Sequence, residues 1–284
     1  MIVLKFGGTS VGTSSALEQV KNIVMAHQEP VIVVVSALGG MTDQLVELMQ
    51  MDSRSSKVTE MLDAFGCRYA NLISAMIDES IQPQVRTDIN RLLRELQKEI
   101  GNAPRDTYFQ DKIISYGERL SSVFITRLFG AKNAVLVPVL DLVSTLADNR
   151  SLDRDISFSR INDYFRNNDA DIYIVPGFIA SAPDGHITNL GRGGSDLTAA
   201  IIARALNVSK IEIWTDVDGY MTADPRRDSN AAQIPQLTYD AALDMSLNGA
   251  KVVYAPALEI MKDVRIPLEV KNTFNPDGRF TSIR

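Results

Sequence analysis

One lysine and two glycines lie near the start of the chain, where a short apolar run ends. They belong to the stretch KFGGTS at residues 5–10, which directly follows Ile2–Leu4. Gly7 and Gly8 let the backbone approach a ligand closely, and Lys5 supplies a mobile positive charge, so phosphate is a natural partner. A tight turn between a strand and a helix, with a solvated lysine, explains these residues equally well. The spacing matches neither a Walker A loop nor the G-x-G-x-x-G fingerprint of dinucleotide-binding proteins.

A second glycine-rich loop, NLGRGGSD at residues 189–196, runs into the strongly helical segment LTAAIIA. Its glycines and Ser195 therefore lie at a helix N-terminus, where free amide donors and the helix dipole favour anions. Arg192 adds a planar guanidinium suited to a carboxylate or phosphate. Asp196 is explained either as an acid in the first helical turn or as a functional group, and its position beside an arginine and an anion site favours the second interpretation.

A third polar segment, WTDVDGYMTADPR at residues 214–226, follows an apolar strand. It carries three aspartates, a glycine, a proline and an arginine. Because aspartate, glycine and proline are common in turns, the segment by itself indicates no more than a polar surface loop.

The elements that position these loops are strands alternating with helices. Six apolar runs rich in β-branched residues are predicted as strands, namely Ile2–Phe6, Val31–Ser36, Ala134–Val137, Ile172–Val175, Ile211–Thr215 and Leu268–Lys271. Their lack of polar alternation is typical of strands covered on both faces. The pattern predicts an α/β protein with a mostly parallel sheet between layers of helices, and ligands in such sheets gather at the carboxyl ends of the strands.

Local signals place the first helices. The capping box at Ser15–Glu18 predicts a helix that runs to about Ala26, and Thr42 is expected to cap the next one. Two longer helices are expected on either side of Pro83, at Val58–Ser80 and Gln84–Ile100. Residues 51–57 and 143–155 are polar and predicted to be surface loops.

Composition excludes several classes of protein. The 284 residues carry 29 Lys and Arg against 35 Asp and Glu, a net charge of −6, which favours neither nucleic acid nor an anionic membrane as a partner. A lone Cys67 fits a reducing compartment, and the only histidines, His27 and His186, show no metal-ligand spacing. Apolar runs are too short to span a bilayer, and no signal-peptide pattern opens the chain, so we expect a cytoplasmic protein.

Together the motifs resemble the aspartokinases, members of the amino-acid kinase superfamily. The resemblance covers essentially the whole chain through KFGGTSVG at 5–12, VSALGGMTDQL at 35–45, SYGERLS at 115–121, GFIA at 177–180, NLGRGGSDLTAA at 189–200, WTDVDGYMTADPR at 214–226, NGAKVV at 248–253 and VKNTFNP at 270–276. SYGERLSS and IWTDVDG look most like the kinase half of bifunctional aspartokinase/homoserine dehydrogenases.

The resemblance implies a three-layer αβα sandwich, the amino-acid kinase fold, with a catalytic domain at 1–284. About 1–190 would form an aspartate-binding lobe and about 191–284 a nucleotide-binding lobe. We expect no ACT regulatory domain within this range, and expect the full-length protein to carry ACT domains. A homoserine dehydrogenase domain and a homo-oligomeric assembly are further candidates.

Roles follow residue by residue from the resemblance. The implied catalytic residues are Lys5, Asp196 and Lys251, with Asp196 orienting the lysines, and the implied phosphate-binding residues are Gly7, Gly8 and Ser195. Aspartate would contact Ser36, Thr42, Glu118 and Arg192. The nucleotide would contact Thr215, Asp216, Met221, Arg226 and Val252. Where many relatives have an aliphatic residue and then tyrosine, this chain has Tyr220 and then Met221, so either side chain is a candidate to flank adenine. Relatives often show His-Pro after the lysine of NGAKVV, where this chain has Tyr254-Ala255-Pro256.

The implied reaction is phosphorylation of the side-chain carboxylate of L-aspartate by ATP with Mg²⁺, which gives 4-phospho-L-aspartate, the first step toward lysine, threonine and methionine. We expect no protein ligands to the metal. The carboxylate is ionised at neutral pH, so no strong general base is needed. The alternatives are glutamate 5-kinase, acetylglutamate kinase, uridylate kinase, or a catalytically silent nucleotide-binding module. A dinucleotide-dependent dehydrogenase lacks its glycine fingerprint here.

Overall fold

The computed structural model describes residues 1–102, 105–130, 133–148, 150–223 and 230–284. Across these residues the chain forms one large sheet of eight strands in the order β3-β4-β2-β1-β7-β9-β10-β8. The strands are β1 (Ile2–Phe6), β2 (Val31–Val35), β3 (Ala134–Leu136), β4 (Ile172–Pro176), β7 (Ile211–Thr215), β8 (Gln236–Leu237), β9 (Leu268–Asn272) and β10 (Thr281–Ile283). All paired neighbours are parallel except β9 and β10, which confirms the predicted mostly parallel sheet.

The centre of the sheet is buried on both faces. Every residue of Val31–Val35 is buried, and β1 lies between β2 and β7 with Lys5 opposite Val34 and Ile213. Branched apolar side chains suit such strands because helices cover them on either side. The carboxyl ends of β1, β2 and β7 therefore meet at one edge, where the loops after Phe6, Val35 and Thr215 begin.

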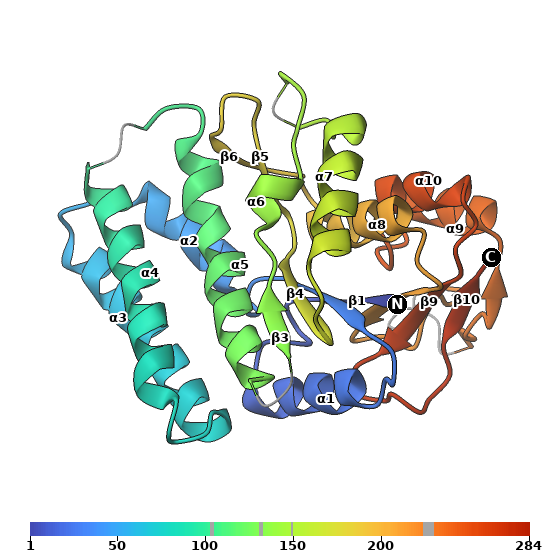
Figure 1. Ribbon diagram of the computed structural model, residues 1–284, viewed down its shortest axis with the longest axis horizontal. Coiled ribbons are helices and arrows are strands. Elements are labelled where there is room, and N and C mark those ends of the chain that lie inside the picture. Colours follow the sequence, from blue (N-terminus) through green and yellow to red (C-terminus); the bar gives the residue numbers. More distant parts are fainter. Residues whose placement is uncertain (103–104, 131–132, 149, 224–229) are drawn as a thin grey trace.

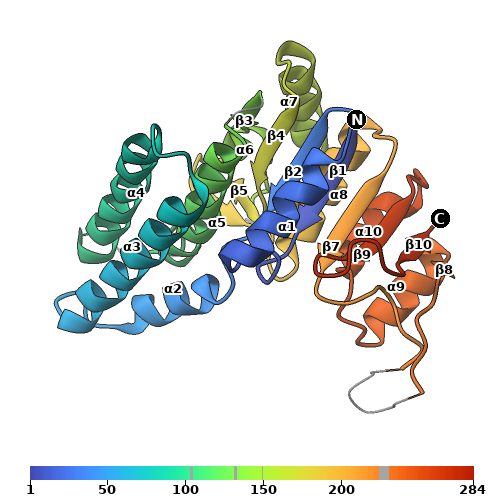
Figure 2. The same cartoon turned by 90° about the horizontal axis from the view of Figure 1, so that it is seen from below.

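Helices cover both faces and form the predicted three-layer sandwich (Figure 1). One core lies under α1 (Ser14–Met25), α2 (Met41–Gln50), α3 (Ser56–Met76), α4 (Gln82–Asn102) and α5 (Phe109–Leu128). The other lies under α6 (Val139–Leu142), α7 (Arg154–Asn167), α8 (Gly194–Leu206), α9 (Tyr239–Leu247) and α10 (Ala255–Lys262). Figure 2 shows α3 and α4 on the outer side of α5, away from the sheet. A small antiparallel hairpin, β5 (Ile179–Ser181) with β6 (Ile187–Asn189), leads into α8.

Side chains divide between the two cores by strand alternation. Leu4 and Phe6 of β1 belong to the first core, whereas Val3 belongs to the second. Lys5 therefore points to the same face as Val3, toward α8, because successive side chains on a strand face opposite sides.

Both predicted helix caps are wrong in position. The first helix begins at Ser14, and its N-cap is Thr13, whose hydroxyl accepts from the amide of Ala16 at 3.2 Å. The second helix begins at Met41 after Gly40, which has φ +81°. Thr42 consequently lies inside the first turn, because a left-handed glycine rather than a hydroxyl ends the preceding loop.

Other predicted boundaries shift by a few residues. The helix expected at 58–80 ends at Met76, and Pro83 lies inside the first turn of α4, where a proline needs no amide partner. The two predicted loops shorten, because α3 begins at Ser56 and α7 at Arg154. Among the described residues, none of the helices has the length and apolar character needed to cross a bilayer.

Candidate active site

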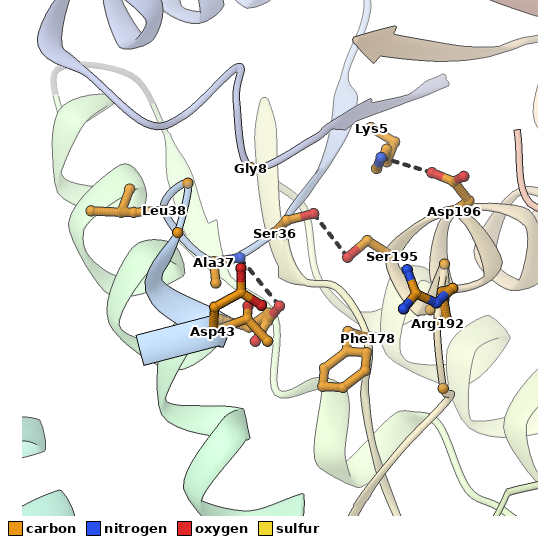
Figure 3. A pocket seen from close by; sticks show the side chains of 17 residues that line it. Lys5, Gly8, Ser36, Ala37, Leu38, Asp43, Phe178, Arg192, Ser195 and Asp196 are labelled. Atoms are coloured by element: carbon orange, nitrogen blue, oxygen red, sulfur yellow. Dashed lines mark hydrogen bonds and ion pairs between the residues drawn. The ribbon is translucent and has the colours of Figure 1, made fainter. Parts of the chain in front are cut away.

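A cleft of about 370 Å³ opens at the carboxyl ends of β1 and β2, beside the start of α8 (Figure 3). It brings together eight of the predicted site residues, namely Lys5, Gly8, Ser36, Thr42, Glu118, Arg192, Ser195 and Asp196. These residues come from four separate parts of the sequence. The position agrees with the rule that ligands of parallel sheets bind at the ends of the strands.

Lys5 and Asp196 form an ion pair at one side of the cleft. Lys5 Nζ lies 2.7 Å from Asp196 Oδ1, and their side chains are only 13% and 10% exposed. The second oxygen of Asp196 accepts from the backbone amide of Tyr254 at 3.1 Å. Gly7 lies beside the ammonium, since a Cβ there would be in ordinary contact with Lys5 Nζ at 3.5 Å. The carboxylate is thus held from two sides and orients the lysine.

Two glycine loops meet backbone to backbone along another wall. A Cβ on Gly39 would lie 3.0 Å from the carbonyl oxygen of Gly8, which is tighter than ordinary contact. Arg68 of α3 connects the two loops through hydrogen bonds. Its Nη1 donates to the carbonyl of Gly39 at 3.0 Å, and its Nη2 donates to the carbonyl of Gly12 at 2.9 Å. Sequence reasoning missed Arg68, because an arginine inside an amphipathic helix carries no local signal of such a contact.

Glu118 is the most unusual acid in the cleft. Glu118 is only 4% exposed. Its Oε1 accepts from the amide of Ala37 at 3.2 Å, whereas its Oε2 is buried with no hydrogen-bond partner among the described residues. Burial raises the pKa of this carboxyl from 4.5 to about 8. A buried carboxyl with one free oxygen suits a cationic ligand such as an ammonium group, which would supply the missing donor.

Arg192 stands in a loop that glycines shape. Gly191 and Gly193 have φ of +74° and +75°, and the amide of Gly194 donates to the carbonyl of Gly191 at 3.0 Å. The Arg192 side chain is exposed to the cleft and makes no hydrogen bond or ion pair with the part of the chain that the structure describes. Its guanidinium is therefore available to an anionic ligand. Ser195, at the start of α8, accepts from the hydroxyl of Ser36 at 2.9 Å.

Phe178 also lines the cleft, with the unusual backbone φ of 68°. Its amide donates to Thr198 at 3.0 Å and its carbonyl accepts from Leu190 at 2.8 Å, so both backbone groups are held. A non-glycine residue in this conformation is strained and such strain gathers at binding sites. The sequence shows GFIA at this position, but no local signal distinguishes this phenylalanine from a core residue.

Of the residues predicted to bind nucleotide, the described ones, Thr215, Asp216, Met221 and Val252, do not line this cleft. Thr215 is the last residue of β7, and its hydroxyl donates to the side chain of Asp216, the next residue, at 3.2 Å. Lys251 is exposed, and Met221 and Val252 are partly exposed. Arg226 lies outside the described residues. Tyr220 is fully buried, with its hydroxyl 3.1 Å from Ser246, so it belongs to the core and leaves Met221 as the candidate to flank a base.

Gly117 of α5 lies in close contact with Ala37, which lines the cleft. A Cβ at this position would lie 2.7 Å from the Cβ of Ala37, so we expect Gly117→Ala to lower the free energy of unfolding by about 1–3 kcal/mol. Gly66→Ala is the matched control on α3, since its Cβ would meet only Leu93 at an ordinary 3.7 Å. We expect that change to be neutral or stabilising by up to about 1 kcal/mol. Urea denaturation measures both, and equal effects would contradict the close contact at Gly117.

Comparison with known proteins identifies the family of this chain. Residues 1–272 match the amino acid kinase family. The chain belongs to this family. It is 30% identical over 290 residues to a bifunctional aspartokinase/homoserine dehydrogenase of Buchnera aphidicola, covering 97% of this chain and 35% of that protein. It is 32% identical over 286 residues to lysine-sensitive aspartokinase 3 of Escherichia coli, covering 97% of this chain and 62% of that one.

Solved structures agree with the resemblance to aspartokinases. The structure of E. coli aspartokinase III in complex with aspartate and ADP superimposes with a TM-score of 0.89 at 30% identity, covering 100% of this chain and 65% of that one. The predicted amino-acid kinase fold and the predicted resemblance are both confirmed. The chain spans about a third of the length of the bifunctional relatives it matches.

Proposed function

We propose that this chain transfers the γ-phosphoryl group of ATP to the side-chain carboxylate of L-aspartate. The observation that carries the proposal is the buried Glu118, which lines the same cleft as Arg192 and whose Oε2 has no hydrogen-bond partner among the described residues. The carboxyl group of Glu118 complements the ammonium of an α-amino acid, and the guanidinium of Arg192 complements its carboxylate. The similarity to proteins named aspartokinases favours aspartate among the amino acids.

Substrate would lie between α5 and the glycine loop at 191–194. Arg192 would hold the α-carboxylate and Glu118 the α-ammonium, while Thr42 and Ser36 would contact the rest of the molecule. The side-chain carboxylate would then point toward Lys5. Because Arg192 and Asp196 line the same cleft as Glu118, the aspartate site draws on residues from both sides of the proposed lobe boundary near residue 190.

Nucleotide would lie on the other side of Lys5, over the ends of β7 and β9. Thr215, Asp216, Met221 and Val252 would contact the nucleoside, Lys251 would approach the phosphates, and Arg226 is proposed from the resemblance alone. Gly7, Gly8 and Ser195 would lie nearest the transferred phosphoryl group. Close backbone approach and the N-terminus of α8 both favour a phosphate there.

The reaction requires an anion to approach a more highly charged anion. One oxygen of the aspartate side chain forms a bond to the γ-phosphorus, the bond from that phosphorus to the β-γ bridging oxygen breaks, and ADP leaves with the electron pair. The protein mainly positions the groups and cancels negative charge. Lys5, held by Asp196, would meet the charge on the transferred phosphoryl group.

Magnesium fits this site as a companion of the nucleotide. Both oxygens of Asp196 already face protein donors, which fits a carboxylate that orients Lys5. In such sites Mg²⁺ takes few protein ligands and binds phosphate oxygens. When bound it supplies further neutralisation of phosphate charge. Within the described ranges, no group of three His, Cys, Asp or Glu side chains is arranged to hold a metal ion.

A coupled assay of ADP release tests the proposal. We expect turnover that requires both L-aspartate and Mg²⁺, with no turnover on glutamate, N-acetylglutamate or UMP. Turnover on one of those three in place of aspartate would assign the chain to another activity of the family. Tight ATP binding without turnover on any of them would favour a silent nucleotide-binding module. Other expectations from the sequence stay predictions, namely a homo-oligomeric assembly, a cytoplasmic location, and attached ACT or homoserine dehydrogenase domains.

The raised pKa of Glu118 gives the affinity for aspartate a defined pH dependence. At neutral pH the free carboxyl is mostly protonated, with a pKa of about 8, and an ammonium ligand binds best to the ionised form. We therefore expect the affinity for aspartate to increase about tenfold for each unit by which the pH is raised up to pH 7, and to level off above about pH 8. Glu118→Gln should remove this dependence. Calorimetry from pH 6 to pH 9 measures it, and a flat profile in the unmodified protein would contradict an ionising Glu118.

Stability should follow the opposite trend at the same residue. Because the folded-state pKa is raised above its ordinary 4.5, the contribution of Glu118 to stability is complete below that value and is lost as pH rises through about 8. In the absence of ligand, the Glu118→Gln protein should therefore lose less stability than the unmodified protein when the pH is raised from 5 to 9. Thermal denaturation of the two proteins across that range measures the difference.

A further inference from the structure

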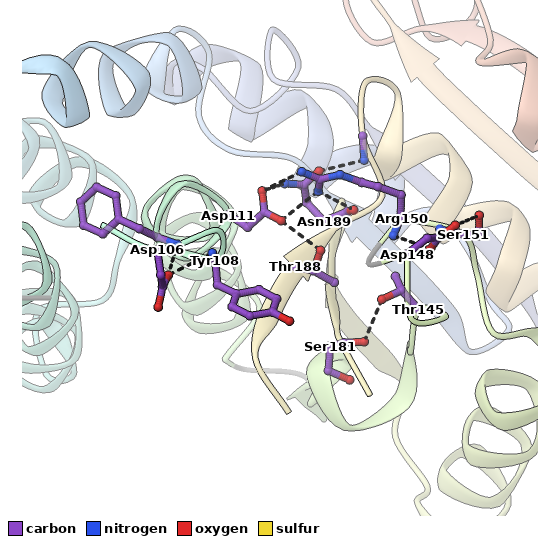
Figure 4. Close-up of polar contacts among 12 residues, drawn as sticks. Asp106, Tyr108, Asp111, Thr145, Asp148, Arg150, Ser151, Ser181, Thr188 and Asn189 are labelled. Carbon is purple, nitrogen blue, oxygen red and sulfur yellow. Dashed lines mark hydrogen bonds and ion pairs between the residues drawn. The ribbon is translucent and has the colours of Figure 1, made fainter. Parts of the chain in front are cut away.

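A buried polar network lies behind the cleft, centred on Asp111 of α5 (Figure 4). The Asp111 side chain is 5% exposed and accepts four hydrogen bonds. Arg150 donates to it twice, at 2.8 and 3.3 Å, while the hydroxyl of Thr188 donates at 3.0 Å and the amide nitrogen of Asn189 at 2.6 Å. None of these residues lines the cleft.

The network continues from Asn189 into the glycine loop. The side-chain oxygen of Asn189 accepts from the backbone amide of Gly191 at 2.9 Å, so the two ends of one side-chain amide connect Asp111 to Gly191. Gly191 and Arg192 both line the cleft. Arg150 also donates to the carbonyl of Asn189 at 3.3 Å, which holds the same residue through its backbone.

The position of Asp111 on α5 gives this chain of contacts a consequence for the site. Asp111 and Glu118 are seven residues apart, so they lie on the same side of the helix, two turns from one another. Helix α5 thus carries Glu118 directly and holds the loop of Arg192 through Asn189. Through these contacts, α5 would set the separation between the two groups that bind the amino acid.

We propose that Asp111 is a positioning residue for substrate recognition, which acts through Asn189 and Gly191 on Arg192. The inference rests on the proposed function, since it assigns the glycine loop to the amino-acid substrate. Arg150 is the exposed end of the same network, with a side chain that is 55% exposed. It neutralises the buried carboxylate and ties the segment before α7 to the site.

Steady-state kinetics of Asp111→Asn test the proposal. The substituted amide places a donor against the donors of Arg150 and Asn189, so the loop loses its support. We expect the KM for aspartate to rise about tenfold, with kcat and the KM for ATP changed less than about threefold. Arg150→Ala should raise the KM for aspartate by a smaller factor, and Arg150→Lys should restore part of that loss because it keeps the charge.

Asp88→Asn is the matched control. Asp88 also accepts from an arginine of α5, Arg127 at 3.0 Å, but that pair lies on α4 and the far end of α5, away from the glycine loop. We expect it to leave all three kinetic constants unchanged. An Asp111→Asn protein that folds with the unmodified KM for aspartate, or a control that shows the same rise, would overturn the proposal.

Amide hydrogen exchange gives a second readout that needs no substrate. In Asp111→Asn, the backbone amide of Gly191 should exchange at least about tenfold faster, while Asp88→Asn leaves it unchanged. If Asp111→Asn does not fold, Arg150→Ala and Asn189→Ala carry the same test. Unmodified protein that fails to turn over aspartate would contradict the proposed function alone, whereas unchanged exchange at Gly191 in all three variants would contradict the positioning role.

Discussion

Replacing Lys5 with methionine should lower kcat for aspartate-dependent ADP release by about 30- to 1,000-fold, with a change of less than about threefold in the KM for aspartate. Lys5 Nζ lies 2.7 Å from Asp196 in a nearly buried position. A charge held ready in such a place stabilises the developing phosphoryl charge by about 2–4 kcal/mol, which methionine of similar length cannot supply. Steady-state kinetics with each substrate varied in turn measure the split.

Lys271→Met is the matched control, because it removes a nearly buried ion pair without removing the lysine that would meet the phosphoryl group. Lys271 is 17% exposed and pairs with Glu212 at 2.9 Å, so it resembles Lys5 in burial and pairing. It lies in register with Trp214, a residue of the first core, and so faces the opposite side of the sheet from Lys5. We expect this control to lower the Tm but to keep kcat. A Lys5→Met protein with unmodified kcat would remove Lys5 from the catalytic role.

Replacing Arg192 with alanine should raise the KM for aspartate by about 30- to 1,000-fold and leave the affinity for ATP nearly unchanged. The guanidinium would bind the α-carboxylate in both the ground state and the transition state, so its loss of about 2–4 kcal/mol falls mainly on KM. Arg192→Lys should recover only part of the binding, because an ammonium lacks the planar pair of donors. Folding should be little affected, since the side chain is exposed.

Nucleotide titration decides between two assignments of the glycine loop. If Arg192→Ala weakens ATP and spares aspartate, the loop at 191–194 binds nucleotide phosphate and the proposed division of the site is wrong. If both substrates weaken together, Arg192 lies where they meet. Only selective loss of aspartate supports the assignment to the amino acid, and it would also support the positioning role of Asp111.

Local sequence determined the layers of this protein and the end of the sheet where the cleft lies. Buried strands such as Val31–Val35 are uniformly apolar and β-branched, so their type and burial follow from side-chain chemistry over a few residues. The carboxyl-end rule then places Lys5 at the edge of the sheet where ligands bind without any knowledge of contacts, because parallel strands end at one edge. Short-range patterns predicted helix caps less well, since Thr13 and Gly40 depend on how each loop enters its helix.

Tertiary structure alone decided which side chains hold the site in shape. Arg68 lies 29 residues from Gly39, and Asp111 lies 78 residues from Asn189, and in neither case does the local sequence mark the partner. The same holds for Glu118, whose pKa is raised by burial and whose Oε1 accepts from the amide of Ala37, 81 residues away. Burial and hydrogen-bond satisfaction depend on everything that surrounds a group in space, so they emerge only when the separate segments pack together.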